Sequence, residues 1–485
     1  DADGITSTAL LTRALRAAAR QPDSILVRLP TRSEGYGLNR TAIDDFADAG
    51  ARLLIAVDCG SSDHAHVEYA QASGLEVVIL DHHHMVDTGP RGAIVVSAQL
   101  NDDGTYRELA AVGVAYLLVA ALAQHGCQID GQGEPETALL DYVALGTVAD
   151  VSPLIGANRS LVRDGLRAIH ERPRPGIAAL CRQAGIAAET LTAEQVSFKL
   201  APRLNAAGRM ADPHLALDLL LSDDLLEATR LAAQIEQLNA ERRKASHQIV
   251  QEAEELLLAQ PGWEERPLLI VRGAKWPAGV LGIAANQLVG RFGRPVIVLS
   301  DDGEMSHGSA RSVPGFDIVE ALGACEDLLV AHGGHSQAAG LTLPSTLVDP
   351  LADALTQQME WSGFVGVPEA ELTLDADLPA ERLTLDTARA LDVLQPYGAG
   401  NEQPLLLVRG LQVRKYDAMG QDRRHLRITL ATKRATVRAV SWGAADRSRE
   451  LLMHPLIDIA ATVGVDTWNG QTRLHVDVKD FRPAV

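Results

Sequence analysis

Four short segments of this chain place acidic residues beside histidines or at the end of an apolar run. The residues concerned are Asp1 and Asp3, Asp58, Asp81 with His82, His83 and His84, and Asp150. Several carboxylates that share one crevice repel one another and resist ionisation unless cations neutralise them. Oxygen ligands mixed with imidazole suit Mn²⁺ or Mg²⁺ better than zinc. Two such ions, about 3.5–4 Å apart, activate a water and stabilise the leaving oxygen of a phosphodiester.

Each segment has a simpler interpretation when it is taken alone. An Asp that follows a strand or ends a helix, as Asp58 and Asp150 do, is more often a turn or capping residue. The histidine run fits a solvated loop, and Asp1–Gly4 resembles a turn or a fragment of a calcium-binding loop. The four segments together, each at the end of a predicted element, favour the metal centre.

The first 100 residues alternate short apolar runs with helical patterns, which predicts a mainly parallel sheet with helices on both faces. The predicted strands are Ile25–Leu29, Leu53–Val57, Val77–Leu80 and Ile94–Val96, and the predicted helices are Thr6–Arg20 and Ala65–Ser73. In an open parallel sheet, sites form beyond the carboxyl ends of the strands. Asp58 and Asp81 directly follow two of these strands, so we expect them at such an edge.

The remaining chain predicts further domains. Residues 109–222 are mostly helical, and Asp223–Gln260 contains no Gly or Pro, which indicates one long connecting helix. A second α/β unit follows, with strands Leu268–Val271 and Val296–Leu299 around a helix Val280–Arg291. After about residue 369, five short strands suit a small barrel such as an OB-fold. These strands are Leu405–Val408, Leu426–Leu430, Thr436–Val440, Ile457–Val463 and Arg473–Val478. We therefore predict an α/β chain with domains 1–222, 223–260, 261–368 and 369–485.

Composition sets weaker limits on function. The chain of 485 residues is 46% hydrophobic and carries a formal net charge of −19. That charge argues mildly against nucleic acid, although a local groove can be basic on an acidic body. The longest apolar run, Val112–Ala123, is too short for a membrane span and suits a buried helix. Four scattered cysteines fit reduced thiols, and we expect a cytoplasmic protein without a membrane partner. Because the chain opens on Asp1 without a Met, we also expect it to be a fragment cut inside a motif.

The four segments together resemble the signature motifs of the DHH phosphoesterase superfamily, and the whole chain most resembles the bacterial RecJ exonucleases. The motif residues are Asp1–Gly4, Asp58–Gly60, Asp81–His83 and Thr147–Asp150. Further matching segments are Leu145–Pro153, Arg203–Arg209, Gly279–Ile283, Gly333–Gly340 and Tyr397–Pro404. The DHH triplet alone is a weak signal, whereas the set is specific.

The resemblance implies a role for each motif residue. It implies two Mn²⁺ or Mg²⁺ ions bridged by Asp58, with Asp1 on one ion and Asp3, His82 and Asp150 on the other. By the same resemblance His83 faces the scissile phosphate, and Asp81 orients the adjacent imidazole. The family's first motif has another Asp two residues before the one that matches Asp1. We therefore expect restored upstream residues to raise the activity of this chain.

The resemblance also implies a binding path for a DNA strand. Ser309 and Arg311 are candidates for a 5′-terminal phosphate, since an Arg fork suits phosphate. Gly333, Gly334 and His335 resemble the signature of the accessory DHHA1 domain, although a turn before a helix is the simpler alternative. Arg203, Asn205 and Arg209 are expected beside the site, with surface salt bridges as the alternative for either Arg. Tyr397, Trp442 and Trp468 are possible stacking residues, but we expect them to pack in the core.

The activity implied is a 5′→3′ exonuclease specific for single-stranded DNA that releases mononucleotides in DNA repair and recombination. A single-strand-binding protein and a helicase are the implied partners. The enzymatic alternatives are a pyrophosphatase or a phosphodiesterase acting on short oligonucleotides or cyclic dinucleotides. Another alternative is a non-catalytic DNA-binding scaffold.

Overall fold

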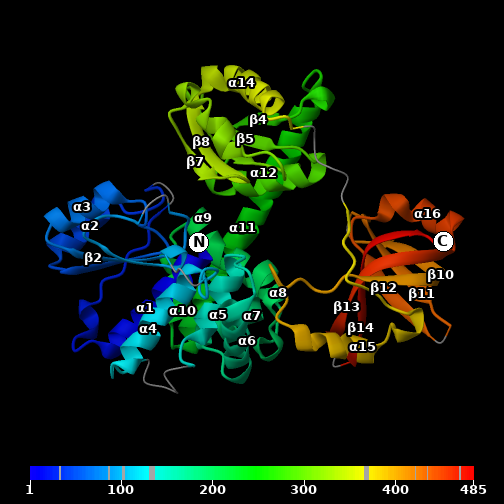
Figure 1. The fold of residues 1–485 in the computed structure, drawn as a ribbon, viewed down its shortest axis with the longest axis horizontal. Coiled ribbons are helices and arrows are strands. Elements are labelled where there is room, and N and C mark those ends of the chain that lie inside the picture. Colours follow the sequence, from blue (N-terminus) through cyan, green and yellow to red (C-terminus); the bar gives the residue numbers. More distant parts are fainter. Residues whose placement is uncertain are drawn as a thin grey trace. The chain divides into compact units, whose positions relative to one another are not determined.

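The computed structural model describes the chain except for residues 32–33, 86–87, 101–103, 130–136, 365–370, 421, 434, 469–470 and 485. The chain divides into two compact units (Figure 1). Unit 1 contains Asp1–Asp150, Gly165–Leu191 and Gln195–Ala370, and unit 2 contains Val151–Asp164, Thr192–Glu194 and Glu371–Val485. In the described part of the chain, no helix combines the length and the apolar character needed to cross a membrane.

The first sheet of unit 1 is parallel, as predicted, in the order β1-β2-β3. Its strands are β1 (Leu53–Val57), β2 (Glu76–Asp81) and β3 (Ile94–Ser97). Helices α2 (Arg40–Asp48) and α3 (His64–Ala72) pack on one face through Ile43 and Val67. Because β1 and β2 are parallel neighbours, their carboxyl ends bring Asp58 and Asp81 to one edge.

The predicted strand Ile25–Leu29 is wrong. This segment lies between a 3₁₀ turn, Pro22–Ser24, and helix α2, and no described strand pairs with it. An apolar run becomes a strand when a neighbour accepts its backbone hydrogen bonds. The first sheet, as described, contains only β1, β2 and β3, so this segment pairs with none of its strands.

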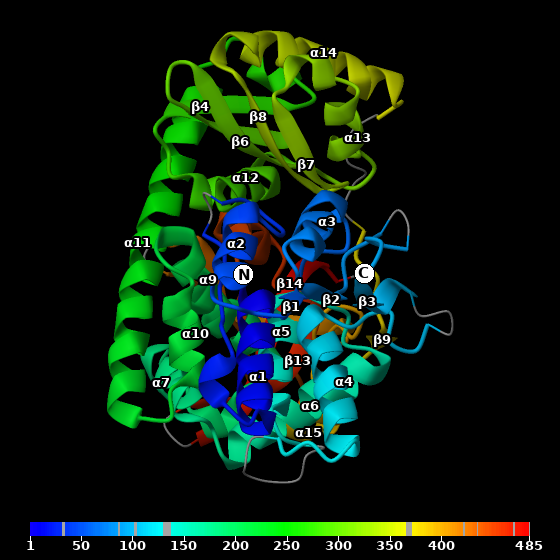
Figure 2. The same ribbon diagram turned by 90° about the vertical axis from the view of Figure 1, so that its left-hand side faces the viewer.

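Helices α1 (Ala2–Ala18), α4 (Ala111–Gln124) and α5 (Leu140–Ala149) pack against one another below this sheet (Figure 2). Gly146 of α5 allows the close approach, since a Cβ there would lie 2.9 Å from Oδ1 of Asp3. The prediction of a buried helix over Val112–Ala123 is confirmed by α4. The following helices are α6 (Gly156–Glu171), α7 (Pro175–Gln183), α8 (Ala193–Gln195), α9 (Ala201–Met210) and α10 (His214–Leu221).

The predicted connecting helix is confirmed as α11, which runs from Leu225 to Leu258. Asp224 caps its first turn by accepting a hydrogen bond from the backbone N–H of Glu227 at 2.8 Å. Figure 2 shows α11 running from the helices of the first domain to the second α/β domain of unit 1.

The second α/β domain contains a mixed sheet in the order β4-β5-β6-β8-β7. The strands are β4 (Leu269–Ala274), β5 (Val296–Asp301), β6 (Met305–Arg311), β7 (Ala331–His335) and β8 (Ala338–Pro344). Helix α12 (Ala278–Phe292) covers one face, and α13 (Ile318–Gly323) and α14 (Val348–Trp361) cover the other. The β4–α12–β5 unit was predicted, whereas strands β6 to β8 were not.

Unit 2 contains the predicted barrel. Strands β10 (Leu406–Met419), β11 (His425–Ala431), β12 (Thr436–Ser441), β13 (Leu456–Trp468) and β14 (Gln471–Pro483) close on themselves through the β10–β11 pair. Short strand β9 (Ala376–Asp377) and helices α15 (Leu385–Leu391) and α16 (Ser448–Met453) complete the barrel domain. The expectation that Trp442 packs in the core is wrong, because this side chain is 56% exposed. Tyr397 is half-buried and donates to the carbonyl of Leu391, whereas the side chain of Trp468 lies outside what the structure describes.

Candidate metal centre

The first two acids lie in the first turn of helix α1. Asp1 is the N-cap, and its Oδ1 accepts hydrogen bonds from the backbone N–H groups of Asp3 at 3.1 Å and Gly4 at 3.3 Å. Asp3 is buried at 1% exposure. Its two carboxylate oxygens accept from the N–H groups of Ala111 at 2.8 Å and Val112 at 3.0 Å. The amino end of α4 therefore fixes the position of the Asp3 carboxyl group.

Asp58 occupies a strained position at the carboxyl end of β1. Its φ of +62° lies in the left-handed region, which is uncommon for a residue other than glycine. Gly4 lies directly against it, since a Cβ on Gly4 would be 3.1 Å from Oδ2 of Asp58. The absence of a side chain at Gly4 thus lets helix α1 bring Asp3 close to the carboxylate of Asp58.

Asp81 ends β2 and organises the histidine run. Its Oδ1 accepts from the backbone N–H of His82 at 2.8 Å and lies 2.7 Å from Nδ1 of His83. Its Oδ2 accepts from the hydroxyl and the backbone N–H of Ser61. Burial opposes the charge of Asp81, but the hydrogen bonds from His83 and Ser61 hold its pKa well below the usual range. Asp81 therefore stays ionised and fixes the His83 ring.

His82 lies among three carboxylates. Its Nε2 is 3.4 Å from Oδ1 of Asp58 and 3.9 Å from Oδ2 of Asp3, and its Nδ1 is 3.9 Å from Oδ2 of Asp150. Asp150 is the C-cap of helix α5. Nε2 is buried and has no hydrogen-bond partner among the described residues, because its approach to Asp58 lacks hydrogen-bond geometry. A buried ring nitrogen without a partner is costly unless a ligand engages it.

The electrostatics of this cluster are unfavourable without a cation. Burial, together with the charges of Asp58 and Asp150, raises the pKa of Asp3 to about 8. Burial opposes the charge of His82, but the contact with Asp58 and the charges of Asp150 and Asp3 raise its pKa to about 9. Both shifts express an excess of negative charge in a desolvated space.

The donor atoms fall into two groups of metal-binding size that share His82. One group comprises Asp58, His82 and His83, and the other comprises Asp3, His82 and Asp150, with the atoms of each group within 4.8 Å of one another. Asp1 belongs to neither group, and its carboxylate caps helix α1. Carboxylate oxygens and imidazole nitrogens, among them the orphaned Nε2 of His82, together fit a divalent cation.

Two contributors to this centre were not predicted from the sequence. The hydroxyl of Tyr36 donates to the carbonyl of Asp58 at 2.9 Å and lies 3.0 Å from Nδ1 of His83. The Tyr36 side chain is nevertheless 72% exposed, because only its oxygen end reaches the cluster. Ser61 is the second, through its bonds to Asp81. The signals available were an aromatic residue between two glycines, Gly35-Tyr36-Gly37, and the serines that follow Asp58-Cys59-Gly60.

Ser309 and Arg311 lie together on strand β6 of the second α/β domain. Nη1 of Arg311 donates to Oγ of Ser309 and to the carbonyl of Ala310, both at 2.8 Å. Gly282 of α12 faces them, since a Cβ there would lie 2.6 Å from Nη2 of Arg311 and 3.0 Å from Oγ of Ser309. The missing side chain lets the guanidinium pack directly against α12. Burial lowers the pKa of this Arg.

Gly333, Gly334 and His335 lie on the exposed edge strand β7, so the alternative of a turn before a helix is wrong. Gly334 has a φ of +146°, and a Cβ there would clash with the backbone of Ala338. The ring of His335 stacks on that of His83, with 6.5 Å between centroids and 13° between planes. Within unit 1, strand β7 thus reaches the metal-binding cluster.

The helix α9 residues differ in their roles. Arg203 is buried, and its guanidinium donates to Glu236 and to the carbonyl of Lys199, both at 2.6 Å. Arg209 donates to the carbonyl of Gly279 at 3.0 Å and so ties α9 to α12. Oδ1 of Asn205 is buried without a partner among the described residues. Arg203 therefore forms a salt bridge with Glu236, whereas Asn205 retains an unused acceptor.

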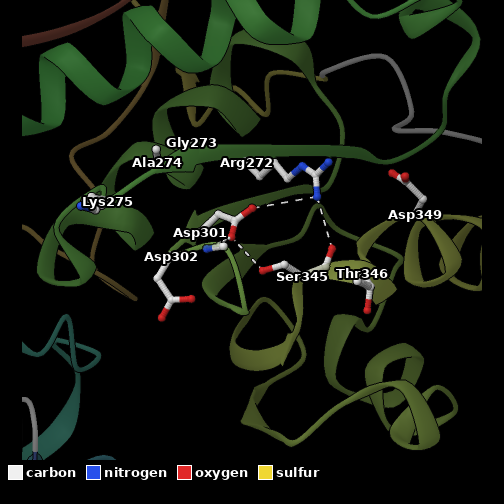
Figure 3. A pocket seen from close by; sticks show the side chains of 10 residues that line it. Arg272, Gly273, Ala274, Lys275, Asp301, Asp302, Ser345, Thr346 and Asp349 are labelled. Atoms are coloured by element: carbon white, nitrogen blue, oxygen red, sulfur yellow. Dashed lines mark hydrogen bonds and ion pairs between the residues drawn. The ribbon is translucent and has the colours of Figure 1, made fainter.

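A separate cavity of about 690 Å³ lies at the carboxyl ends of β4 and β5 (Figure 3). Arg272 extends between Asp301 and the carbonyl of Ser345, and Ser345 donates to Asp301 at 2.7 Å. Arg311 lies at the opposite end of this sheet, since it pairs with Val296 at the start of β5. None of the residues that line this cavity belongs to the metal-binding cluster.

Three family models match the chain. They are the DHH family N-terminal domain over residues 1–147, the DHHA1 domain over residues 265–360, and the RecJ OB domain over residues 374–480. Each match covers one of the three sheets of the structure.

Curated relatives and a solved structure match most of the chain. The single-stranded-DNA-specific exonuclease RecJ of Bacillus subtilis is 34% identical over 99% of this chain, which spans 60% of that relative's length. RecJ of Dickeya dadantii is 38% identical over 83% of this chain and 73% of its own. The crystal structure of Thermus thermophilus RecJ in complex with Mn²⁺ superimposes with a TM-score of 0.82 at 31% identity, over 99% of this chain and 67% of that one.

Proposed function

Because the chain belongs to the RecJ family of single-stranded-DNA-specific exonucleases, we propose that it hydrolyses single-stranded DNA from the 5′ end and releases mononucleotides. The observation that carries this proposal is the pair of donor groups that share His82. Two divalent cations, Mn²⁺ or Mg²⁺, bound there would supply a water of lowered pKa and neutralise charge on the phosphate. Asp3, Asp58, His82 and Asp150 would hold them, and Asp1 stays a predicted ligand.

The other residues of the cluster position the reacting phosphate. Asp81 accepts the proton of Nδ1 of His83, which leaves Nε2 of His83 to bind a phosphate oxygen. His83 is partly exposed and lies between Tyr36 and His335, so a strand end can reach it. The exposed glycine strand β7 lets the sugar-phosphate backbone approach closely.

The 5′ polarity is supported by Ser309 and Arg311. Nη2 of Arg311 packs against Gly282 of α12, and a guanidinium beside the hydroxyl of Ser309 suits the dianionic phosphate at a strand end. Arg203, Asn205 and Arg209 belong to the same proposal as residues that border the strand. A single-strand-binding protein and a helicase are the partners that it implies, because duplex DNA must first be opened. DNA repair and recombination in the cytoplasm are the proposed setting.

End-labelled digestion in the presence of Mn²⁺ tests this proposal. A 5′-labelled single strand should yield labelled mononucleotide at once, whereas a 3′-labelled strand should give progressively shorter fragments. Short RNA oligomers, cyclic dinucleotides and pyrophosphate serve as competing substrates. Preference for any of these, or immediate release of the 3′ label, would contradict the proposed activity.

A further inference from the structure

The cavity at the carboxyl ends of β4 and β5 has the position and the size of a small-molecule site (Figure 3). Its walls are the end of β4 (Arg272–Lys275), the turn after β5 (Asp301–Gly303), and a third wall of Ser345, Thr346 and Asp349. In sheets with parallel strands, ligands bind beyond the carboxyl ends of the strands. The volume of about 690 Å³ lies within the roughly 300–1,000 Å³ that such sites occupy.

The wall at the end of β4 is held in a strained conformation. Lys275 has a φ of +57°, in the left-handed region that glycine or asparagine adopts at lower cost. Its backbone N–H donates to the carbonyl of Asp301 at 3.2 Å. Gly273 lies on the ring of Trp276, where a Cβ would be 2.1 Å away, and Nε1 of Trp276 donates to Glu252 at 2.7 Å. Because strain of this kind gathers at functional sites, a lysine in this position indicates that its side chain is used.

Two cations of this wall have unused donors. Nη1 of Arg272 donates to the carbonyl of Ser345 at 3.2 Å and lies 4.0 Å from Oδ2 of Asp301. Among the described residues, Nε and Nη2 of Arg272 have no hydrogen-bond partner, and the ammonium of Lys275 has neither a hydrogen bond nor an ion pair. Both residues are exposed. Their free N–H groups can therefore bind an anion in the cavity.

The three acids of the cavity are each stabilised by their own turn or helix. Asp301 accepts from a backbone N–H of its turn and from the hydroxyl of Ser345, both at 2.7 Å. Asp302 accepts from two backbone N–H groups of the same turn, at 2.8 and 3.0 Å. Asp349 lies in the first turn of α14, where the amino end of a helix favours a negative charge. These interactions offset the charge of the acids, whereas the charge of Lys275 has no such partner among the described residues.

From this combination of a strained lysine, an arginine with free donors and a cavity of small-molecule size, we infer that the cavity binds the phosphate of a free mononucleotide. Arg272 supplies a planar fork and Lys275 a point charge, and both bind phosphate through charge-assisted hydrogen bonds. Thr346 is exposed at the same cavity, and its hydroxyl offers a further donor. The choice of a mononucleotide rests on the proposed function, which releases this product. Arg311 lies at the opposite end of the sheet, so the cavity is separate from the contact proposed for a 5′-terminal phosphate.

Hydrogen–deuterium exchange of the full chain with dAMP in EDTA tests this site without hydrolysis. dAMP should slow exchange in residues 269–278, and the dependence of this local protection on dAMP concentration gives the affinity of this site alone. Deoxyadenosine, which lacks the phosphate, should give no protection. Absence of protection by dAMP, or equal protection by deoxyadenosine or by inorganic phosphate, would overturn the assignment. Protection by dAMP without Mn²⁺-dependent cleavage of DNA would contradict only the proposed function.

Lys275→Gly separates a ligand contact from a structural role. Glycine adopts a φ of +57° more readily than lysine, so the thermal midpoint should not fall. The affinity for dAMP should nevertheless fall about tenfold, because a charge-assisted hydrogen bond is lost. Arg272→Gln should lower the affinity by a similar factor, and Arg266→Gln, at an exposed arginine of the same domain, is the matched control. Wild-type affinity in both cavity variants would overturn the proposal.

Discussion

Oδ1 of Asp81 lies 2.7 Å from Nδ1 of His83, and both residues come from the same short segment at the carboxyl end of β2. The contact selects one nitrogen of the imidazole to face Asp81 and the other to face the site. Because Asp81 is buried and remains ionised, it acts on the reaction through His83.

Asp81→Asn should remove this orientation. We expect kcat to fall roughly 10–100-fold, as is typical when a residue that orients a ligand is lost, with a smaller change in KM. Asp349→Asn, at an exposed acid of the second α/β domain, is the control. A KM effect larger than the kcat effect would show that Asp81 serves substrate binding instead.

His82→Ala and Asp58→Ala should each abolish cleavage, because His82 belongs to both donor groups and Asp58 to one of them. Neither substitution removes a group proposed to border the strand, so strand binding in EDTA should remain close to that of the unchanged chain. Cleavage and binding are measured on the same labelled strand. Unchanged cleavage in both variants would remove the metal assignment.

Gly282→Ala should displace the guanidinium of Arg311, since the new Cβ would lie 2.6 Å from Nη2. The rate on a 5′-phosphorylated strand should then fall towards the rate on a 5′-hydroxyl strand. Gly290→Ala, on the same helix, is a matched control because no atom lies within 4 Å of a Cβ there. Equal losses for both strand ends would exclude a role in recognising the terminal phosphate.

Mn²⁺ binding should release protons near neutral pH. The pKa values of Asp3, about 8, and His82, about 9, are raised above neutrality, so the metal-free site holds protons that cations must displace. Affinity for Mn²⁺ should therefore rise as the pH increases through this range. Calorimetric titration in two buffers of different ionisation enthalpy measures the released protons, and identical heats in both would contradict the prediction.

Arg174→Met should destabilise unit 1. Arg174 donates to Oδ2 of the buried Asp141 at 2.7 Å, and removing one partner of a buried pair costs about 3–5 kcal/mol. Burial raises the pKa of Asp141 and Arg174 lowers it, so the variant carboxyl has a still higher pKa. The loss of stability should thus be larger at neutral pH, where the unpaired carboxylate must stay buried or take up a proton, than at acidic pH, where Asp141 is protonated. Urea midpoints at the two pH values measure the difference, and a loss independent of pH would contradict it.

Where local pattern and tertiary packing agree, the sequence was a good guide to the fold. Strand β1 covers Leu53–Val57 as predicted, since a short apolar run followed by Asp and Gly is typical of a buried parallel strand. Ile25–Leu29 has a similar pattern but finds no described partner strand. Strands β6 and β7 were missed because His307-Gly308-Ser309 and His332-Gly333-Gly334 lack apolar alternation. Their place in the sheet depends on pairing with β8, which comes later in the chain.

The sequence by itself determined which residues could bind cations, because Asp and His residues at the ends of predicted strands and helices can be recognised from residue type and spacing. Only the tertiary structure decided how they are used. It placed His82 among Asp3, Asp58 and Asp150, brought Tyr36 to His83 and exposed Trp442 on the barrel. These outcomes depend on contacts between distant segments and on the burial they create, and side-chain type and local spacing do not encode either.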